Sequence, residues 1–221
     1  MKRVLVAGAT GLLGKHVINQ LRQRGMTVRA LARNTSKLSE LGLDETVTAD
    51  LTRVEMLRGC CDGADAVISC AGASMNLNNF GDRESFYRID FQGNLNLLNE
   101  AKKTPNIKFI YVSLAGASGL RQTEYADAHE KFVEALKASG IRHAVVRPTG
   151  FFGFNLELLK FAAKGRGLVI GKGNYKTNPI HEAEVALACV EALESDVAEI
   201  SIGGPEILTR QETVEMAFAV L

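Results

Sequence analysis

Segments with the hydrophobic pattern of strands alternate with segments that have the pattern of helices, from the first residues of the chain onward. Val4–Ala7 is a short run of apolar residues followed by glycine, as expected of a buried strand. In residues 12–24, Leu13 and Val17 begin a series of apolar side chains three or four positions apart, which places them on one face of a helix. Gly25 then ends that helix. The chain therefore opens with a strand, a glycine-containing turn and a helix.

The same alternation continues to residue 146. We expect further strands at 27–32, 46–49, 66–69, 108–112 and 141–146, and helices at 83–103 and 122–139. Strands rich in Val, Ile and Ala that alternate with helices are typical of a parallel sheet covered on both faces. The crossover connections of such a sheet are right-handed. The sequence therefore predicts a doubly wound α/β fold, which binds its ligands at the carboxyl ends of the strands.

The pattern changes after Arg147–Pro148. Residues 151–179 are rich in glycine and show no long apolar helix. Three more elements follow: a helix at 181–194, a strand near 199–202 and a helix from about 209. We interpret 150–221 as a small lobe on the substrate side of a single domain that spans 1–221.

Composition and charge exclude several classes of protein. The 221 residues are 46% hydrophobic and 23% charged, which is typical of a globular protein and not of a disordered or fibrous one. The 26 basic and 25 acidic residues nearly cancel, so we expect no nucleic acid partner. No run of 18 apolar residues predicts a membrane span. The four cysteines lack a CxxC pair and metal-binding spacing, which favours reduced thiols in a cytoplasmic protein without a bound metal.

The strongest chemical signal is a glycine-rich segment between the first strand and the first helix. Gly8 permits a tight turn, Gly11 lets a pyrophosphate approach the backbone, and Gly14 allows the helix to pack closely on the strand. The helix N-terminus adds unpaired N–H groups and the positive end of a dipole. The sequence therefore predicts a dinucleotide site whose phosphate loop comprises Gly8, Thr10, Gly11, Leu12, Leu13 and Gly14.

The segment VLVAGATGLLGKHV resembles the start of extended and atypical short-chain dehydrogenase/reductases, most closely the NmrA-like and NAD(P)-dependent epimerase-like branch. The resemblance reaches about residue 215 and implies a Rossmann fold. It also implies one of two functions. The first is an oxidoreductase or epimerase acting on a carbonyl or sugar-like small molecule, and the second is a catalytically weak NADP(H)-sensing or assembly protein with a protein partner. The supporting segments are VRALARN, TADLT, ISCAGA, FQGNLNLLNEAK, FIYVSLAGA, SGIRHAVVRPTGFFG and NPIHEAEVA.

The end of the second strand indicates which dinucleotide is bound. A carboxylate there would accept the ribose hydroxyls of NAD, but this chain has Arg33 and Asn34, with Lys37 one helical turn on. An arginine can bind a phosphate bidentately and stack on adenine. We therefore predict NADP, with NAD the less favoured cofactor. The resemblance implies three further groups of contacts: Asp50 and Leu51 at the adenine, Cys70, Ala71 and Gly72 beside the ribose, and Pro148, Thr149 and Gly150 over the nicotinamide.

Catalytic members of the superfamily use a Ser, a Tyr and a Lys four residues after the Tyr. By resemblance Ser113 matches the Ser and Tyr125 the Tyr, but His129 stands at the Lys position. Lys131 lies about 200° around the helix from the expected Lys face and does not replace it. A neutral imidazole carries no fixed charge at pH 7, although it could bond a ribose hydroxyl or act as an acid or base. Two interpretations remain open: a working Ser113–Tyr125–His129 site, or a site that binds the cofactor and does little chemistry.

Several features of the second half leave the substrate undefined. Residues 74–82 and 151–179 are expected to form the pocket walls, and their composition encodes no recognisable substrate. His181 either faces the pocket or shapes the start of a helix. Relatives suggest a monomer or a homodimer. The chain stops at 217–221 within a predicted helix, which fits either a short member or a truncated one.

Overall fold

The computed structural model describes residues 2–43, 45–73, 86–169 and 171–221. Within them, seven strands form one sheet in the order β3-β2-β1-β4-β5-β6-β8, and every neighbouring pair is parallel. The strands are β1 (Arg3–Ala7), β2 (Thr27–Ala32), β3 (Glu45–Thr48), β4 (Ala66–Ser69), β5 (Lys108–Val112), β6 (Arg142–Pro148) and β8 (Glu199–Ile202). The order reverses between β1 and β4, which is where doubly wound sheets bind ligands.

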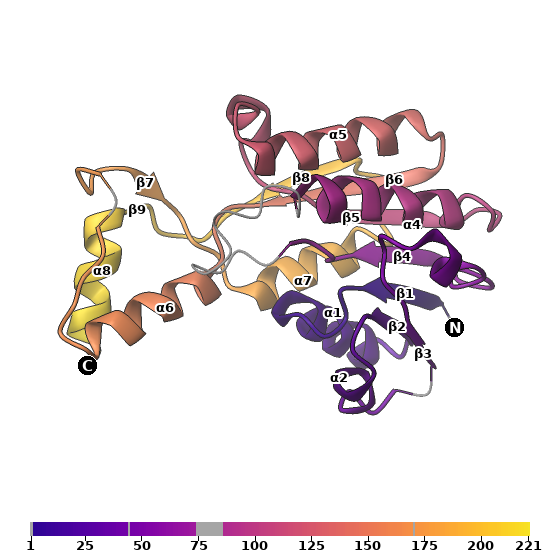
Figure 1. Cartoon of the computed structure of the whole chain (residues 1–221), viewed down its shortest axis with the longest axis horizontal. Coiled ribbons are helices and arrows are strands. Elements are labelled where there is room, and N and C mark those ends of the chain that lie inside the picture. Colours follow the sequence, from indigo (N-terminus) through magenta and orange to yellow (C-terminus); the bar gives the residue numbers. More distant parts are fainter. Residues whose placement is uncertain (1, 44, 74–85, 170) are drawn as a thin grey trace.

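Helices cover both faces of the sheet (Figure 1). On one face lie α1 (Leu12–Gln23) and α7 (Glu182–Glu191), and on the other lie α4 (Asn94–Ala101) and α5 (Glu124–Ala138). Alternate residues of β1 point to opposite faces. Val4 and Val6 belong to the apolar core that includes α1 and α7, whereas Leu5 and Ala7 belong to the core that includes α4 and α5. The predicted doubly wound fold is confirmed.

The helix predicted at 83–103 is not a uniform α-helix. Its described part begins with eight residues of π-helix, η2 (Phe86–Gly93), and continues as α4. The short elements α2 (Thr35–Ser39), η1 (Val54–Leu57) and η3 (Ala117–Leu120) complete this half of the molecule. Residues 83–85 of the predicted helix, and the whole of the predicted wall 74–82, lie outside the described residues.

Only part of 150–221 leaves the sheet. There α6 (Phe152–Ala162) packs on α8 (Arg210–Ala219), and β7 (Lys176–Thr177) pairs antiparallel with β9 (Leu208–Thr209), on the left of Figure 1. The remainder belongs to the main layers, since α7 packs on α1 and β8 extends the sheet beside β6. Among the helices of the described chain, none is both long and apolar enough to cross a bilayer.

The expectation of no long helix in 151–179 was wrong, because α6 occupies eleven of these residues. Its sequence contains Leu156, Leu158, Leu159 and Lys160, all good helix formers. The glycines that suggested a loop lie mostly after the helix, and Gly165 takes the left-handed conformation (φ +68°) just beyond its end. Glycine content averaged over the segment therefore concealed a helix at its start.

Candidate functional site

The glycine loop has backbone geometry that only glycine fits well. Gly8 has a φ of +74°, and a Cβ added to it would lie 2.8 Å from the carbonyl oxygen of Cys70. The Gly11 N–H donates to the Gly8 carbonyl at 3.0 Å and closes the turn. A Cβ at Gly14 would collide with the Gly8 carbonyl oxygen and lie 2.9 Å from the Ala9 Cα. The loop is therefore held tightly between β1, α1 and the end of β4.

The N-terminus of α1 is open toward the carboxyl ends of the strands. Gly11 is its N-cap and provides no side-chain hydrogen bond to the first turn. Leu12 is exposed, Thr10 is half-buried, and Leu13 packs into the core. N–H groups without a side-chain acceptor, at the positive end of a helix, suit a pyrophosphate. The predicted loop residues therefore fit the phosphates of a dinucleotide.

The side chains after β2 divide into a structural group and an exposed basic group. Asn34 caps α2, because its Oδ1 accepts from the Lys37 N–H at 3.0 Å. Arg33 and Lys37 are exposed, and both lie where an adenosine ribose would approach. Asp50 accepts from the Thr52 N–H and hydroxyl at 2.9 and 2.8 Å. Burial acts to raise the pKa of Asp50, but these hydrogen bonds and the charges of Arg33 and Arg88 outweigh it and lower the pKa.

One buried amide side chain bonds two carbonyls of the π-helix. The Asn94 Nδ2 group donates to the carbonyls of Ile89 at 3.3 Å and Asp90 at 3.0 Å. The Ser69 hydroxyl, at the end of β4, donates to the Asn94 Oδ1 at 2.5 Å. Single π-helical turns are frequent at functional sites. Here the widened turn carries the fully buried Asp90 toward the loop that follows β4.

That loop contains Cys70, Ala71 and Gly72, the three residues predicted to lie beside the cofactor ribose. Asn94 Nδ2 also donates to the Ala71 carbonyl at 3.2 Å, and the Ala73 N–H donates to Asp90 Oδ1 at 2.9 Å. A Cβ on Gly72 would lie 2.7 Å from the same Asp90 oxygen, so glycine leaves room for the carboxyl. Burial raises the pKa of the Cys70 thiol to about 12, which keeps it protonated and unreactive as a nucleophile.

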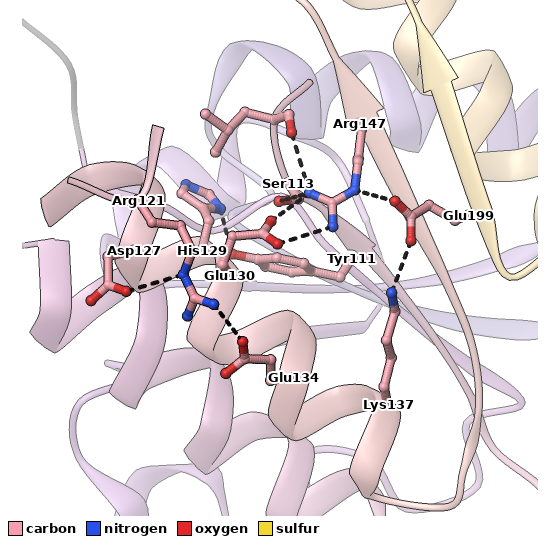
Figure 2. A network of polar contacts seen from close by, with 11 residues as sticks. Tyr111, Ser113, Arg121, Asp127, His129, Glu130, Glu134, Lys137, Arg147 and Glu199 are labelled. Carbon is pink, nitrogen blue, oxygen red and sulfur yellow. Dashed lines mark hydrogen bonds and ion pairs between the residues drawn. The ribbon is translucent and has the colours of Figure 1, made fainter. Parts of the chain in front are cut away.

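Ser113 lies in a buried polar network centred on Arg147 (Figure 2). The guanidinium donates to Glu130 at 2.6 Å, to Glu199 at 2.5 Å and to the Ser113 hydroxyl at 3.3 Å. Glu199 also accepts from Lys137 at 3.0 Å, nearer the surface. These side chains come from β5, α5, β6 and β8. The network fixes Ser113 beside α5, and its hydroxyl accepts a hydrogen bond from a cation.

Tyr125 and His129 share one face of α5, as the spacing predicts. Their rings meet edge to face with centroids 4.8 Å apart, and Phe86 packs on Tyr125 with centroids 5.3 Å apart. Lys131 faces elsewhere, as predicted, since its Nζ pairs with Asp127 at 2.8 Å. Burial, followed by the charge of Asp90, raises the pKa of Tyr125 to about 12. The site therefore does not supply the positive field that would lower it.

His129 is only 5% exposed, and its Nδ1 lies 2.6 Å from the buried Tyr111 hydroxyl. Burial and then the nearby Arg147 charge lower the pKa of His129 to about 3, so the imidazole is neutral at pH 7. Its hydrogen bond to Tyr111 is directed into the protein. Among the described residues the other ring nitrogen, Nε2, has no hydrogen-bond partner, so it is the atom left to bond a further group.

The residues after β6 form hydrogen bonds to the segment that leads into α7. Pro148 is buried, and the Thr149 hydroxyl donates to the Asn178 carbonyl at 2.6 Å. The Gly150 carbonyl accepts from the Ile180 N–H at 2.9 Å. These contacts tie the end of β6 to the segment that enters α7, and they leave Gly150 exposed at the predicted nicotinamide side.

His181 shapes the start of a helix, one of the two roles that the sequence left open. Its Nδ1 accepts from the Ala183 N–H at 3.1 Å and caps α7, and Glu184 completes a capping box. It also lines a cavity of about 420 Å³, together with Leu12, His16, Phe152, Gly153, Asn155, Leu156, Leu159, Glu182, Leu208, Thr213, Met216, Ala217 and Val220. Part of 151–179 therefore forms a pocket wall, but the cavity does not include Ser113, Tyr125 or His129.

Four residues of this site were missed by the sequence reasoning: Asp90, Tyr111, Glu130 and Arg147. A signal was available for Arg147, a charged residue at the end of an apolar strand, whereas Asp90 and Glu130 have the pattern of ordinary solvated acids on amphipathic helices. Over 2–43, 45–73, 86–169 and 171–221, no group of three or more His, Cys, Asp or Glu residues is placed to hold a metal ion.

The fold and loop together define the class of protein, a Rossmann-type α/β protein with a glycine loop shaped for a dinucleotide. A family model described as NAD(P)H-binding matches residues 8–196, and the chain belongs to this NAD(P)H-binding family. Among solved structures, UDP-glucose 4-epimerase from Thermotoga maritima with UDP-glucose matches with a TM-score of 0.85 at 19% identity, covering 99% of this chain and 82% of that chain. The resemblance to extended short-chain dehydrogenase/reductases is confirmed.

The names of the curated relatives indicate different functions. The chain is 30% identical over 244 residues to divinyl chlorophyllide a 8-vinyl-reductase of Zea mays, covering 99% of this chain and 59% of the relative. It is 29% identical over 152 residues to Photosystem II assembly factor Ycf39 of Cyanophora paradoxa, covering 67% of this chain and 46% of the relative. The chain thus spans 46% to 59% of the length of these relatives.

Proposed function

We propose that this chain binds NADP(H) and acts as a dinucleotide sensor or assembly protein, with little Tyr–Lys-type hydride chemistry of its own. The observation that carries the proposal is His129, a neutral, buried side chain at the position where catalytic relatives have Lys. A fixed cation at that position would hold the ribose and lower the Tyr pKa. Here the Tyr125 pKa is raised and the imidazole bonds Tyr111 instead.

A sensor or assembly role implies a protein partner that distinguishes the bound from the free protein. Such a role is named for the 29% identical assembly factor, whereas the 30% identical reductase names a catalytic one. The unpaired, reduced thiols support a cytoplasmic location within this proposal. A monomer and a homodimer are both compatible with it, and light scattering with and without NADPH distinguishes them.

We expect wild-type protein to bind NADPH with micromolar affinity and to show no NADPH oxidation above background with a panel of carbonyl substrates. Tyr125→Phe should leave both results unchanged, because the phenol is not activated. His129→Lys tests whether the missing cation alone prevents NADPH oxidation, and circular dichroism checks that this variant is folded. NADPH oxidation by wild type that disappears in Tyr125→Phe would contradict the proposal and establish an enzyme.

The exposed Arg33 supports NADP over NAD as the dinucleotide. We expect Arg33→Asp to weaken NADPH binding by about tenfold or more, because an ion pair with the 2′-phosphate worth about 1.4 kcal/mol is replaced by repulsion. NADH affinity should change little or improve. The matched control is Arg22→Asp, which changes an exposed arginine in the last turn of α1, away from the glycine loop. Equal losses of affinity for NADPH and NADH would show that Arg33 does not bind the 2′-phosphate.

A second candidate function, an NADPH-dependent reductase, is favoured by one observation. The raised pKa of Tyr125 keeps its phenol protonated, and a protonated phenol is the form that donates a proton during reduction. NADPH held by the glycine loop would supply the hydride for such a reduction, and Tyr125 would give its proton to the developing alkoxide. Such a site would reduce and would oxidise poorly, so turnover seen only in the reducing direction would support it.

A further inference from the structure

A buried carboxyl group and a buried imidazole face each other behind the loop that follows β4. Asp90 is fully buried, and His129 is 5% exposed. Among the described residues, the Asp90 Oδ2 and the His129 Nε2 are the buried side-chain atoms without a hydrogen-bond partner. The Asp90 Oδ1 lies 3.9 Å from the same Nε2. Buried polar groups are nearly always paired, so two unpaired atoms at one place require an explanation.

The hydrogen bond on the other side of the imidazole determines what Nε2 presents to Asp90. Burial raises the pKa of Tyr111, so its phenol keeps its proton and shares a 2.6 Å hydrogen bond with the His129 Nδ1; when the phenol is the donor of this bond, Nδ1 is the acceptor. A neutral imidazole that accepts at Nδ1 carries its own hydrogen on Nε2. That N–H lies 3.9 Å from the Asp90 Oδ1, too far for a hydrogen bond, and its positive end faces the carboxyl.

Asp90 connects this pair to the predicted cofactor loop. Its Oδ1 accepts from the Ala73 N–H at 2.9 Å, and Gly72 leaves the space that the carboxyl occupies. Charged acceptors make shorter and stronger hydrogen bonds than neutral ones. The carboxylate therefore holds the loop more firmly than the protonated acid does.

We propose that Asp90 is a positioning residue for the dinucleotide: as a carboxylate facing His129, it fixes the loop Cys70–Ala73 in the conformation that receives the nicotinamide ribose. The inference rests on the proposed function, since it assumes that the chain binds NADP(H). The inference also gives a role to His129, which stands where catalytic relatives have Lys, because its neutral N–H donor faces the buried carboxylate.

The groups around the pair leave Asp90 as the one that titrates near neutral pH. Asp90 faces the His129 ring at 3.9 Å, and its charge acts on Tyr125 of α5 and Tyr111 of β5. Glu130 and Arg147 act on Tyr111, and the Arg147 charge is balanced by Glu130 and Glu199. Burial raises the pKa of Asp90 to about 7, whereas His129 is neutral throughout that range. Protonation of Asp90 below pH 7 should therefore weaken NADPH binding.

The test is NADPH affinity by calorimetry at pH 6, 7 and 8 for wild type, Asp90→Asn and the control Asp127→Asn, which changes a surface carboxylate of α5. Asn accepts the Ala73 hydrogen bond but does not titrate. Because the 2′-phosphate itself titrates near pH 6, the ratio of the variant Kd to the wild-type Kd is compared. For a group with a pKa of about 7, this ratio should fall about tenfold from pH 8 to pH 6 for Asp90→Asn and stay constant for Asp127→Asn.

Two further measurements remain informative if Asp90→Asn folds poorly. His129→Phe removes the facing N–H and should move the midpoint of the pH dependence to higher pH, which a merely structural role would not do. In wild type, carboxyl NMR should show NADPH binding lowering the pKa of Asp90. A constant ratio for Asp90→Asn, or an Asp90 pKa that NADPH does not change, overturns the inference. Absence of NADPH binding by wild type at every pH instead overturns the proposed function.

Discussion

Gly8→Ala should abolish NADPH binding and lower the free energy of unfolding by about 3 kcal/mol or more. An alanine at φ +74° carries the cost of the left-handed region, about 1–2 kcal/mol. Its Cβ would also lie 2.8 to 2.9 Å from backbone atoms of Cys70 and Ala71. Backbone atoms of two adjacent strand ends cannot rotate away as a side chain could. The loop must therefore separate from β4, at the place where the pyrophosphate is expected.

The matched control is Gly25→Ala. Gly25 has nearly the same φ, +68°, but its added Cβ meets nothing within 4 Å. It should therefore show only the conformational cost, about 1–2 kcal/mol, and should bind NADPH like wild type. Urea denaturation and nucleotide titration of both variants measure the two effects separately. Equal free energies of unfolding for the two variants would show that the close contacts of the Gly8 Cβ do not destabilise the protein.

The strands and the two helical layers were predictable because their signals are local. Apolar runs predicted β2, β4, β5 and β8 with the observed bounds. Helical spacing predicted the shared face of Tyr125 and His129 and the separate direction of Lys131. The wide turn of η2 has no such signal, since it depends on the Asn94 and Ser69 side chains meeting across two elements. Tertiary contacts, and not local propensity, determine that helix.

The sequence predicted which residues stand at the candidate catalytic positions, but not their protonation states or hydrogen bonds. The four-residue spacing places His129 where the resemblance implies a Lys. Its neutrality depends on burial beside Tyr111 and near Arg147, residues that lie 18 positions before and after it in the chain. Asp90 was missed for the same reason, because a single acid within an amphipathic helix is ordinarily a solvated residue. Which polar groups are buried next to each other is determined by the folded chain, and the hydrophobic pattern of the sequence does not show it.

The buried ion pairs of Arg147 lead to the second prediction of a large effect on the free energy of unfolding. Arg147→Met should lower the free energy of unfolding by about 3–5 kcal/mol, because it leaves the Glu130 carboxylate 8% exposed and without its 2.6 Å partner. The double variant Arg147→Met/Glu130→Gln should recover a large part of this loss, since neither buried charge then lacks a partner. Lys137→Met, which removes the exposed cation paired with Glu199 at 3.0 Å, should cost less than about 1 kcal/mol. Denaturant unfolding of wild type, these three variants and the single variant Glu130→Gln measures the coupling, and additive losses in the double variant would show that Arg147 stabilises by packing alone.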